Sequence, residues 1–320
     1  MNNGFVRCAR LGCLLLVGTW VAALPAEKTA DAPAPRPKFK NQRHVPVTLS
    51  PETRRPPPPG YELVFDDEFD GDALNSTKWV YRTDEKMLSR QQPSNVTVGS
   101  GCLQIALRKE PAGTKAYSGG GVISRETFCY GYFEARFKTP DAEGWHTSFW
   151  AQKYAGFRKP GGPRDWLELD FCEQDGGDPH FYSFGIINKV PDAANGQTWS
   201  AGRWVVEDGP DTSADFHVWA CEFTPDKIRF YFDGHLAKEE SSAGFPHDDM
   251  SVWLTTIAAT LKGDRWVDDS KLPNAVQFDY VRVSQHPKYR EAEVAMRALA
   301  AKRVEPPVVK PAGNALKDLN

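Results

Sequence analysis

The sequence predicts an all-β protein built as an antiparallel β-sandwich or barrel, and three observations carry this prediction. Short runs at 103–107, 131–137 and 227–232 alternate between apolar and polar residues and are rich in aromatic and β-branched side chains. Turn-forming residues interrupt such runs at close intervals, as Asp233-Gly234 does directly after the third run. No long helical period occurs between residues 60 and 286. Many short strands with frequent turns are typical of sheets that pack on one another.

The N-terminal residues differ in composition from the rest of the chain. Residues 1–26 are predicted to be a signal peptide, because Arg7 and Arg10 precede an apolar run at 11–24. A single membrane anchor is the alternative, but a spanning helix needs about 20 apolar residues and this run is shorter. We therefore expect a secreted, extracytoplasmic protein with no stable membrane span. Residues 27–59 hold nine prolines and are predicted to be an extended linker that builds no core.

The central segment, residues 60–286, is long enough for one large domain and is strongly acidic. It carries 23 basic and 35 acidic side chains, a net charge of 23 − 35 = −12, whereas the whole chain carries −3. This charge argues against nucleic acid as a partner and weighs mildly against polyanionic substrates. Residues 287–320 are predicted to be a short helix, ending near Arg303, and a disordered tail. The helix has an apolar stripe that should pack on the domain itself, formed by Tyr289, Ala292, Met296 and Leu299.

Four of the six cysteines lie outside the predicted signal peptide, and their spacing matches no zinc site. Cys172 and Cys221 fall in strand-like runs, which favours buried thiols. A Cys102–Cys129 disulfide is an alternative that an exported protein permits.

The most informative segment is the acidic run from Asp165 to Glu173. In a strand with a period of two, the side chains divide into two faces, Trp166, Glu168 and Asp170 on one and Leu167, Leu169 and Phe171 on the other. Strict alternation would turn Glu173 toward the apolar face. A β-bulge at Phe171-Cys172 would return Glu173 to the side of the other two acids.

Three carboxylates on one strand face suit the hydrolysis of a glycosidic bond. That reaction needs one carboxylic acid to protonate the leaving oxygen and one carboxylate to act as nucleophile or to activate water. Taken alone, the E-x-D-x-x-E pattern fits two other interpretations at least as well. It also describes a strand with one solvated face, and a calcium site.

Tryptophans strengthen the carbohydrate interpretation. Nine of the ten lie between residues 60 and 286. Indole rings offer flat apolar faces for the C–H faces of sugars and an N–H for a hydroxyl, although any single one is more often a core residue. Trp166 shares the face of the acids, and Trp145 and Trp150 lie on the aromatic run that precedes the acidic strand.

Several ordered segments together resemble glycoside hydrolase family 16, the group of laminarinases, agarases and carrageenases. The segments, which span roughly residues 61–285, are YELVFDDEFDG at 61–71, GVISR at 121–125, YGYFEAR at 130–136, WHTSFW at 145–150, TPDKIRFYFDG at 224–234 and FDYVRV at 278–283. The resemblance implies a jelly roll similar to concanavalin A, with a concave sugar-binding cleft. It implies Glu168 as nucleophile, Glu173 as acid/base and Asp170 as the residue that orients the nucleophile.

The resemblance also suggests further residues and leaves some points open. Candidate substrate-binding residues are Trp166, Trp145, Trp150, Asn188 and Arg125. Asn188 takes a position where many relatives have a histidine, and Arg125 serves equally well in a structural ion pair. No cofactor is needed for catalysis and no catalytic metal is expected, but a structural calcium through Asp279 or Glu68 would be consistent with the family.

The leading hypothesis is a secreted, monomeric, retaining endo-β-glycanase that degrades a polysaccharide, with β-1,3-glucan of the laminarin type as the first candidate. An agar- or carrageenan-type galactan is the second. Retention requires the carboxyl groups of Glu168 and Glu173 to lie about 5–5.5 Å apart. A transglycosylase and a non-catalytic carbohydrate-binding protein on the same scaffold are further alternatives.

Overall fold

The computed structural model describes residues 45–53, 56–153, 166–192, 196–247, 249–259, 266–291 and 293–294. The side chains of residues 166, 189–192 and 196–201 are outside this description. The predicted signal peptide, the first part of the predicted linker and most of the C-terminal tail therefore lie outside the described residues.

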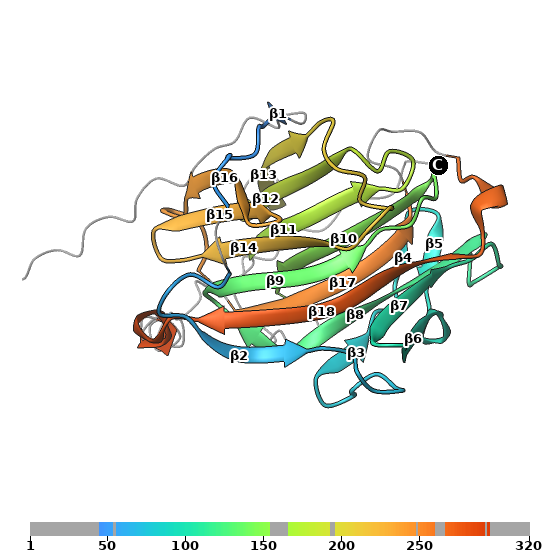
Figure 1. Cartoon of the computed structure of the whole chain (residues 1–320), viewed down its shortest axis with the longest axis horizontal. Helices are drawn as coiled ribbons and strands as arrows, with labels where there is room; N and C mark the ends of the chain where they lie inside the picture. The colour runs from blue at the N-terminus through green and yellow to red at the C-terminus, as the bar shows by residue number, and fades with distance from the viewer. Residues whose placement is uncertain are drawn as a thin grey trace, which may run out of the picture. The chain divides into compact units, whose positions relative to one another are not determined.

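Two large sheets form the domain and pack face to face, which confirms the all-β prediction (Figure 1). Sheet A contains, in spatial order, β1 (Val45–Pro46), β13 (Gly196–Val206), β12 (Tyr182–Asp192), β11 (Trp166–Asp175), β10 (Trp145–Gln152), β17 (Met250–Ala258), β8 (Tyr117–Phe128), β5 (Ser89–Gln91) and β4 (Glu85–Lys86), with β3 (Trp79–Tyr81) on β8. Sheet B contains β16 (His235–Ser241), β15 (Lys227–Phe232), β14 (His217–Phe223), β9 (Gly131–Lys138), β18 (Asn274–Gln285), β7 (Cys102–Leu107) and β6 (Val96–Gly99), with β2 (Glu62–Asp67) on β18. Two short 3₁₀ helices, η1 (Pro93–Asn95) and η3 (Asp269–Lys271), lie in connections.

The strand pairs are antiparallel except for two short parallel contacts, β1 with β13 and β5 with β8. Neighbouring strands are often far apart in sequence, as where β17 lies between β10 and β8, or β9 between β14 and β18. The chain therefore crosses repeatedly from one sheet to the other, as in a jelly roll.

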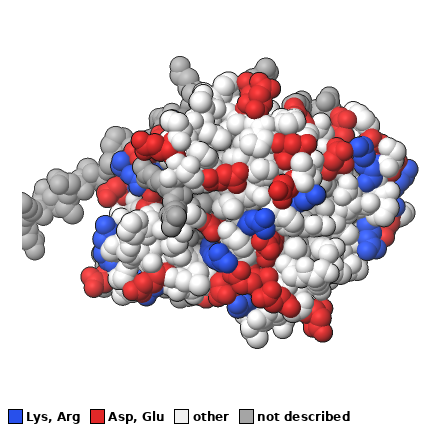
Figure 2. All heavy atoms as spheres, viewed as in Figure 1, with Lys and Arg blue, Asp and Glu red and all other residues white. Residues whose placement is uncertain are grey.

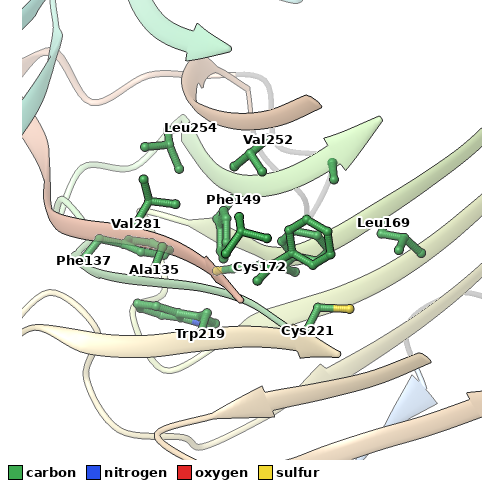
Figure 3. Packing of buried hydrophobic residues seen from close by; sticks show 14 of the residues in the cluster. Ala135, Phe137, Phe149, Leu169, Cys172, Trp219, Cys221, Val252, Leu254 and Val281 are labelled. Carbon is green, nitrogen blue, oxygen red and sulfur yellow. The ribbon is translucent and has the colours of Figure 1, made fainter. Parts of the chain in front are cut away.

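The core lies between the sheets and consists of the alternate apolar residues that the sequence pattern marks. In sheet B, Ala135 and Phe137 point inward from β9, and they belong to the same buried cluster as Phe149 and Leu169 of sheet A (Figure 3). Aromatic rings interlock there, with the centroids of Phe149 and Phe171 4.8 Å apart. Burial of these large apolar surfaces is the main stabilising contribution to the fold.

The predicted bulge in β11 is present. Against β12, Asp170 pairs with Gly185 and Glu173 pairs with Ser183, so two residues of β11 oppose one of β12. The register with β10 shifts at the same place. Phe171 and Cys172 are consequently both buried in the core, although they are consecutive in the strand.

Part of the segment expected to be a free linker is instead attached to the domain. β1 adds in parallel to the edge of sheet A beside β13. Val47 and Leu49 pack against the core, and the backbone N–H of Ser50 donates to the carbonyl of Leu236. The prediction of an extended segment that contributes nothing to the core is thus wrong for residues 45–50, because an open sheet edge and an apolar surface are available to them.

The C-terminal helix begins at Pro287, as predicted, and is described to residue 294 apart from residue 292. Tyr289 packs on the domain, with its ring centroid 6.3 Å from that of Tyr61. The four cysteines beyond the predicted signal peptide are thiols, three of them buried, so the alternative Cys102–Cys129 disulfide does not form. Within the described residues, no helix is long and apolar enough to cross a membrane.

We predict that Phe171→Ala lowers the free energy of unfolding by about 3–5 kcal/mol, because the substitution leaves a cavity between the two sheets at the bulge. Urea denaturation followed by tryptophan fluorescence measures this change. Leu63→Ala is the matched control, because Leu63 is 57% exposed and should change the free energy by less than about 0.5 kcal/mol. A Phe171→Ala protein as stable as the control variant would show that the bulge residue is not part of the core.

Candidate active site

The structure places the three acids of β11 on the face of sheet A that points away from the core, which we call the acidic face. Asp170 is 4% and Glu173 9% exposed, and Glu168 is half-buried. All three lie close enough to the guanidinium of Arg203 to affect its ionisation. The bulge therefore brings Glu173 to the side of the other two carboxylates, as the sequence pattern predicts.

A row of residues crosses the acidic face from strand to strand. In the register of sheet A, Arg203 of β13 lies opposite Gly185 of β12, and Gly185 lies opposite Asp170 of β11. The row continues from Asp170 to Trp150 of β10 and from there to Trp253 of β17. Cation, carboxylate and indole are thus adjacent along one line, although they come from four separate parts of the sequence.

Gly185 makes this arrangement possible because it has no side chain. A Cβ atom at this position would lie 2.7 Å from Oδ2 of Asp170, so the side chain of Asp170 would have to shift. From β13, on the far side of β12, Nη1 of Arg203 donates to Oε2 of Glu173 at 3.2 Å. The charge of Glu173 is the main cause of the raised pKa of Arg203, with smaller contributions from Asp170 and Glu168.

His146 of β10 contacts Glu173 from the other side. Its Nε2 lies 3.5 Å from Oε1 of the carboxylate. Burial lowers the pKa of His146, and the nearby charges of Glu173 and Asp175 only partly oppose this effect. The imidazole is therefore kept neutral at a position next to a carboxylate.

An aromatic platform lies beside the acids. The rings of Trp150 and Trp253 are 4.6 Å apart and inclined by 31°, and Nε1 of Trp150 donates to Oγ1 of Thr255 at 3.1 Å. The guanidinium of Arg82 lies over both rings, at 6.0 Å and 5.7 Å, and is itself paired with Asp84. Two fixed indoles beside carboxylates form a surface of the kind that binds a sugar ring.

Two of the predicted substrate-binding tryptophans are not part of this platform as described. Trp145 is 0% exposed and belongs to a second core cluster with Leu107 and Val267, so its assignment to substrate binding is wrong. Alternation explains the error, because Trp145 and Trp150 are an odd number of residues apart on β10 and point to opposite faces. The side chain of Trp166 lies outside the described residues.

Asn188 is placed away from the acids. It lies opposite Leu167 in the register, and both side chains are buried on the core side, whereas Ile187 lies opposite Glu168. Asn188 is therefore not positioned to contact a substrate held by Glu168 and Glu173. Arg125 is exposed, and its Nε donates to the backbone carbonyl of Ser76, so its part in substrate binding stays a prediction.

The two acids considered for calcium are both paired with arginines. Glu68 binds Arg282 through both oxygens at 2.7 Å, and Asp279 accepts from Arg136 at 2.5 Å. Among the described residues, no group of three or more histidine, cysteine or acidic side chains is arranged to hold a metal ion. These residues do not fit a calcium site.

Sequence reasoning missed Arg203, His146, Gly185 and Trp253 as members of the site. Each is ordinary in its own segment, and only the register of sheet A shows that it borders the acids. The sequence contains a weak indication for His146, because it is an even number of residues from Trp150 on β10 and therefore lies on the same face of the strand.

Most of this domain is similar to known proteins. A family model described as "Beta-porphyranase A-D, GH16 domain" matches residues 63–285. A β-glucanase from Rhodothermus marinus is 29% identical over 252 residues, covering 70% of this chain and 85% of the relative. β-Porphyranase E from Zobellia galactanivorans is 30% identical over 253 residues, covering 70% and 88%. The chain covers only 53% of two β-glucanases from Acetivibrio thermocellus.

A solved structure shows the same fold. The non-specific endo-β-1,3(4)-glucanase SCLam, from family GH16, superposes with a TM-score of 0.60 at 26% identity, covering 73% of this chain and 94% of its own.

We predict that His146 makes the folded state sensitive to acid. Its lowered pKa means that the unfolded chain, with an ordinary value near 6.5, takes up a proton first, so stability is lost as the pH falls below this value. His146→Gln should therefore flatten the decrease in the free energy of unfolding between about pH 7 and pH 5. Urea denaturation at several pH values measures the slope.

His217 provides a control of opposite sign. Its hydrogen bond with Asp233 raises the pKa of His217. The contribution of His217 to the free energy of unfolding is therefore complete below about pH 6.5, and it is lost as the pH rises through the raised pKa. His217→Gln should weaken the protein more in acid than in mild alkali. An equal pH slope in the wild type and in His146→Gln would contradict the assignment.

Proposed function

We propose that this chain, which belongs to glycoside hydrolase family 16 and is a glycoside hydrolase, is a retaining endo-β-glycanase. It cleaves a polysaccharide by double displacement. The observation that carries the proposal is the bulge in β11, which directs Glu168, Asp170 and Glu173 to one face beside two indoles. A retaining glycosidase needs two such carboxyl groups, which flank the scissile bond and lie about 5–5.5 Å apart.

In the first step Glu168 attacks the anomeric carbon while protonated Glu173 donates its proton to the departing oxygen. The bond to the leaving sugar breaks, and a glycosyl ester with Glu168 forms. In the second step Glu173, now a carboxylate, removes a proton from water. The resulting hydroxide attacks the anomeric carbon and releases Glu168, so the configuration of the anomeric carbon is retained overall.

Asp170 lies between the two glutamates on the same face, and we propose that its charge orients the nucleophile. Arg203 and His146 both contact the carboxyl group of Glu173. In the proposed reaction Glu173 is a carboxylate after it has protonated the leaving group and before it activates water. We infer that the guanidinium of Arg203 stabilises this state.

We propose a β-galactan of the porphyran type as the first substrate candidate. The family model described as β-porphyranase spans nearly the whole domain, and a β-porphyranase is 30% identical over 88% of its own length. This reverses the order expected from composition. β-1,3-Glucan is the second candidate, supported by the net charge of −12 between residues 60 and 286 and by the β-glucanase relative. Secretion, proposed from the first 26 residues, would bring the enzyme to an extracellular polymer.

We predict that the purified protein releases reducing ends from at least one of porphyran, agarose, κ-carrageenan, laminarin and mixed-linkage glucan. Glu168→Gln should lower this activity by roughly 10³-fold or more, because an amide cannot form the glycosyl ester. Reducing-sugar assays and chromatography of the products measure both effects.

Glu126→Gln is the matched control, since Glu126 is an exposed acid of β8 in the same sheet. Activity that survives intact in Glu168→Gln would remove Glu168 as nucleophile. A wild-type protein that binds a polymer of the panel without cleaving it would favour the non-catalytic alternative, and longer products than substrates would favour transglycosylation.

We further predict that Trp150→Ala lowers kcat/KM by roughly 10- to 100-fold, mainly through KM, because a stacking surface for the sugar is lost. Initial rates over a range of polymer concentrations separate the two constants. Trp145→Phe is the control, because Trp145 is buried in the core and should affect KM little. Unchanged KM in Trp150→Ala would exclude the platform as a binding surface.

A further inference from the structure

A pocket lies on the opposite side of the domain from the acids, on the outer face of sheet B. Its volume is about 330 Å³, at the lower end of the range of small-molecule sites. It is lined by Pro56, Pro57, Leu63, Glu68, Tyr132, Glu134, Arg282 and Ser284. Alternation on β9 and β18 explains its position, because Phe133 and Val283 point into the core and the residues next to them point outward.

Glu134 is the unusual group of this pocket. The side chain is on a residue that is only 6% exposed, and Oε1 accepts a hydrogen bond from the hydroxyl of Tyr280 at 2.9 Å. Oε2 is buried and receives no hydrogen bond from any described residue. Burial raises the pKa of Glu134, as expected for a carboxyl group that lacks sufficient donors. A buried acceptor without a donor is costly, so a donor supplied by a ligand would be bound favourably.

The charges around Glu134 indicate that this ligand is neutral. Both oxygens of Glu68 are engaged by Arg282, whose guanidinium also lies 3.8 Å from the centre of the Tyr280 ring. An anionic ligand would be repelled by the two carboxyl groups, and a cationic ligand would be repelled by the guanidinium. On the surface viewed in Figure 2, acidic and basic side chains likewise lie interspersed, with acidic ones covering the larger area.

Half of the lining residues are apolar or aromatic. Pro56, Pro57 and Leu63 contribute apolar surface, and Tyr132 contributes an aromatic ring. The pocket therefore combines surfaces for C–H groups with one unsatisfied acceptor and the hydroxyl of Ser284. A ligand that matches has C–H faces and several hydroxyl groups.

We propose that this pocket binds one unit of a neutral saccharide, with a sugar hydroxyl donating to the carboxyl group of Glu134 and the ring against the prolines and Tyr132. The site is distinct from the acidic face, and it gives the protein a second contact with polysaccharide. The proposal takes from the proposed function only the expectation that the protein encounters such polymers.

The experiment uses the full chain carrying Glu168→Gln, so that no oligosaccharide is consumed. Hydrogen–deuterium exchange followed by mass spectrometry is recorded with laminarihexaose, cellohexaose and neoagarohexaose. Peptides from β9 and β18 report on the pocket, and peptides from β11 report on the acidic face. We expect at least one of the three sugars to protect the β9 and β18 peptides.

Two added variants test the assignment. Glu134→Met keeps the length of the side chain but removes the acceptor, and should weaken protection of β9 and β18 by roughly tenfold in apparent Kd. Leu63→Asp places a charge on the rim at an exposed residue, where folding is not at risk, and should act in the same direction. Glu240→Gln, an acid of β16 in the same sheet that pairs with Lys238, is the control and should change nothing.

The outcomes separate the two proposals. Protection confined to β11 would overturn the pocket while supporting the proposed function. Protection of β9 and β18 that both variants abolish, without any at β11, would support the pocket and count against the proposed function. Protection that survives in both variants, or no protection of β9 and β18 by any of the three sugars, would overturn the pocket.

Discussion

One extra residue in β11 is the constraint on which the rest of the site depends. Without the bulge, period-two alternation would bury Glu173 among the aromatic rings between the sheets and turn Cys172 outward. With it, Phe171 and Cys172 both enter the core, and Glu173 returns to the acidic face. The same local irregularity thus serves stability and chemistry, because it places an aromatic ring in the core and a carboxylate beside two others.

Three carboxylates on one strand repel one another, and the structure shows how sheet A accommodates them. Arg203 supplies a positive charge from two strands away and donates to Glu173, while Gly185 on the strand between them leaves room for the side chain of Asp170. His146 remains neutral on the other side and adds no further charge. The site is therefore stabilised by contacts across strands rather than by residues of β11 itself, which is the usual way in which sheets organise their faces.

The two sheets present related chemistry on opposite surfaces. On the acidic face, carboxylates lie beside indoles and the guanidiniums of Arg203 and Arg82, while the pocket of sheet B combines Glu134, Tyr132 and Arg282. The difference is the balance of charge. Glu68 and Arg282 compensate each other in the pocket, which leaves a single acceptor for binding and no second acid for hydrolysis. One surface is thus suited to cleaving a sugar chain and the other only to holding it.

The sequence by itself determined the class of fold, the bulge and the three acids, because each of these depends on local alternation along one strand and on turn-forming residues. Only the tertiary structure decided which other side chains border the acids. Trp145 and Asn188 point into the core, and Arg203 and Trp253 reach the site from strands distant in sequence. The same holds for residues 45–50, whose attachment required a sheet edge that does not exist until the domain has folded. Register between strands is a property of the assembled sheet, and no single segment encodes it.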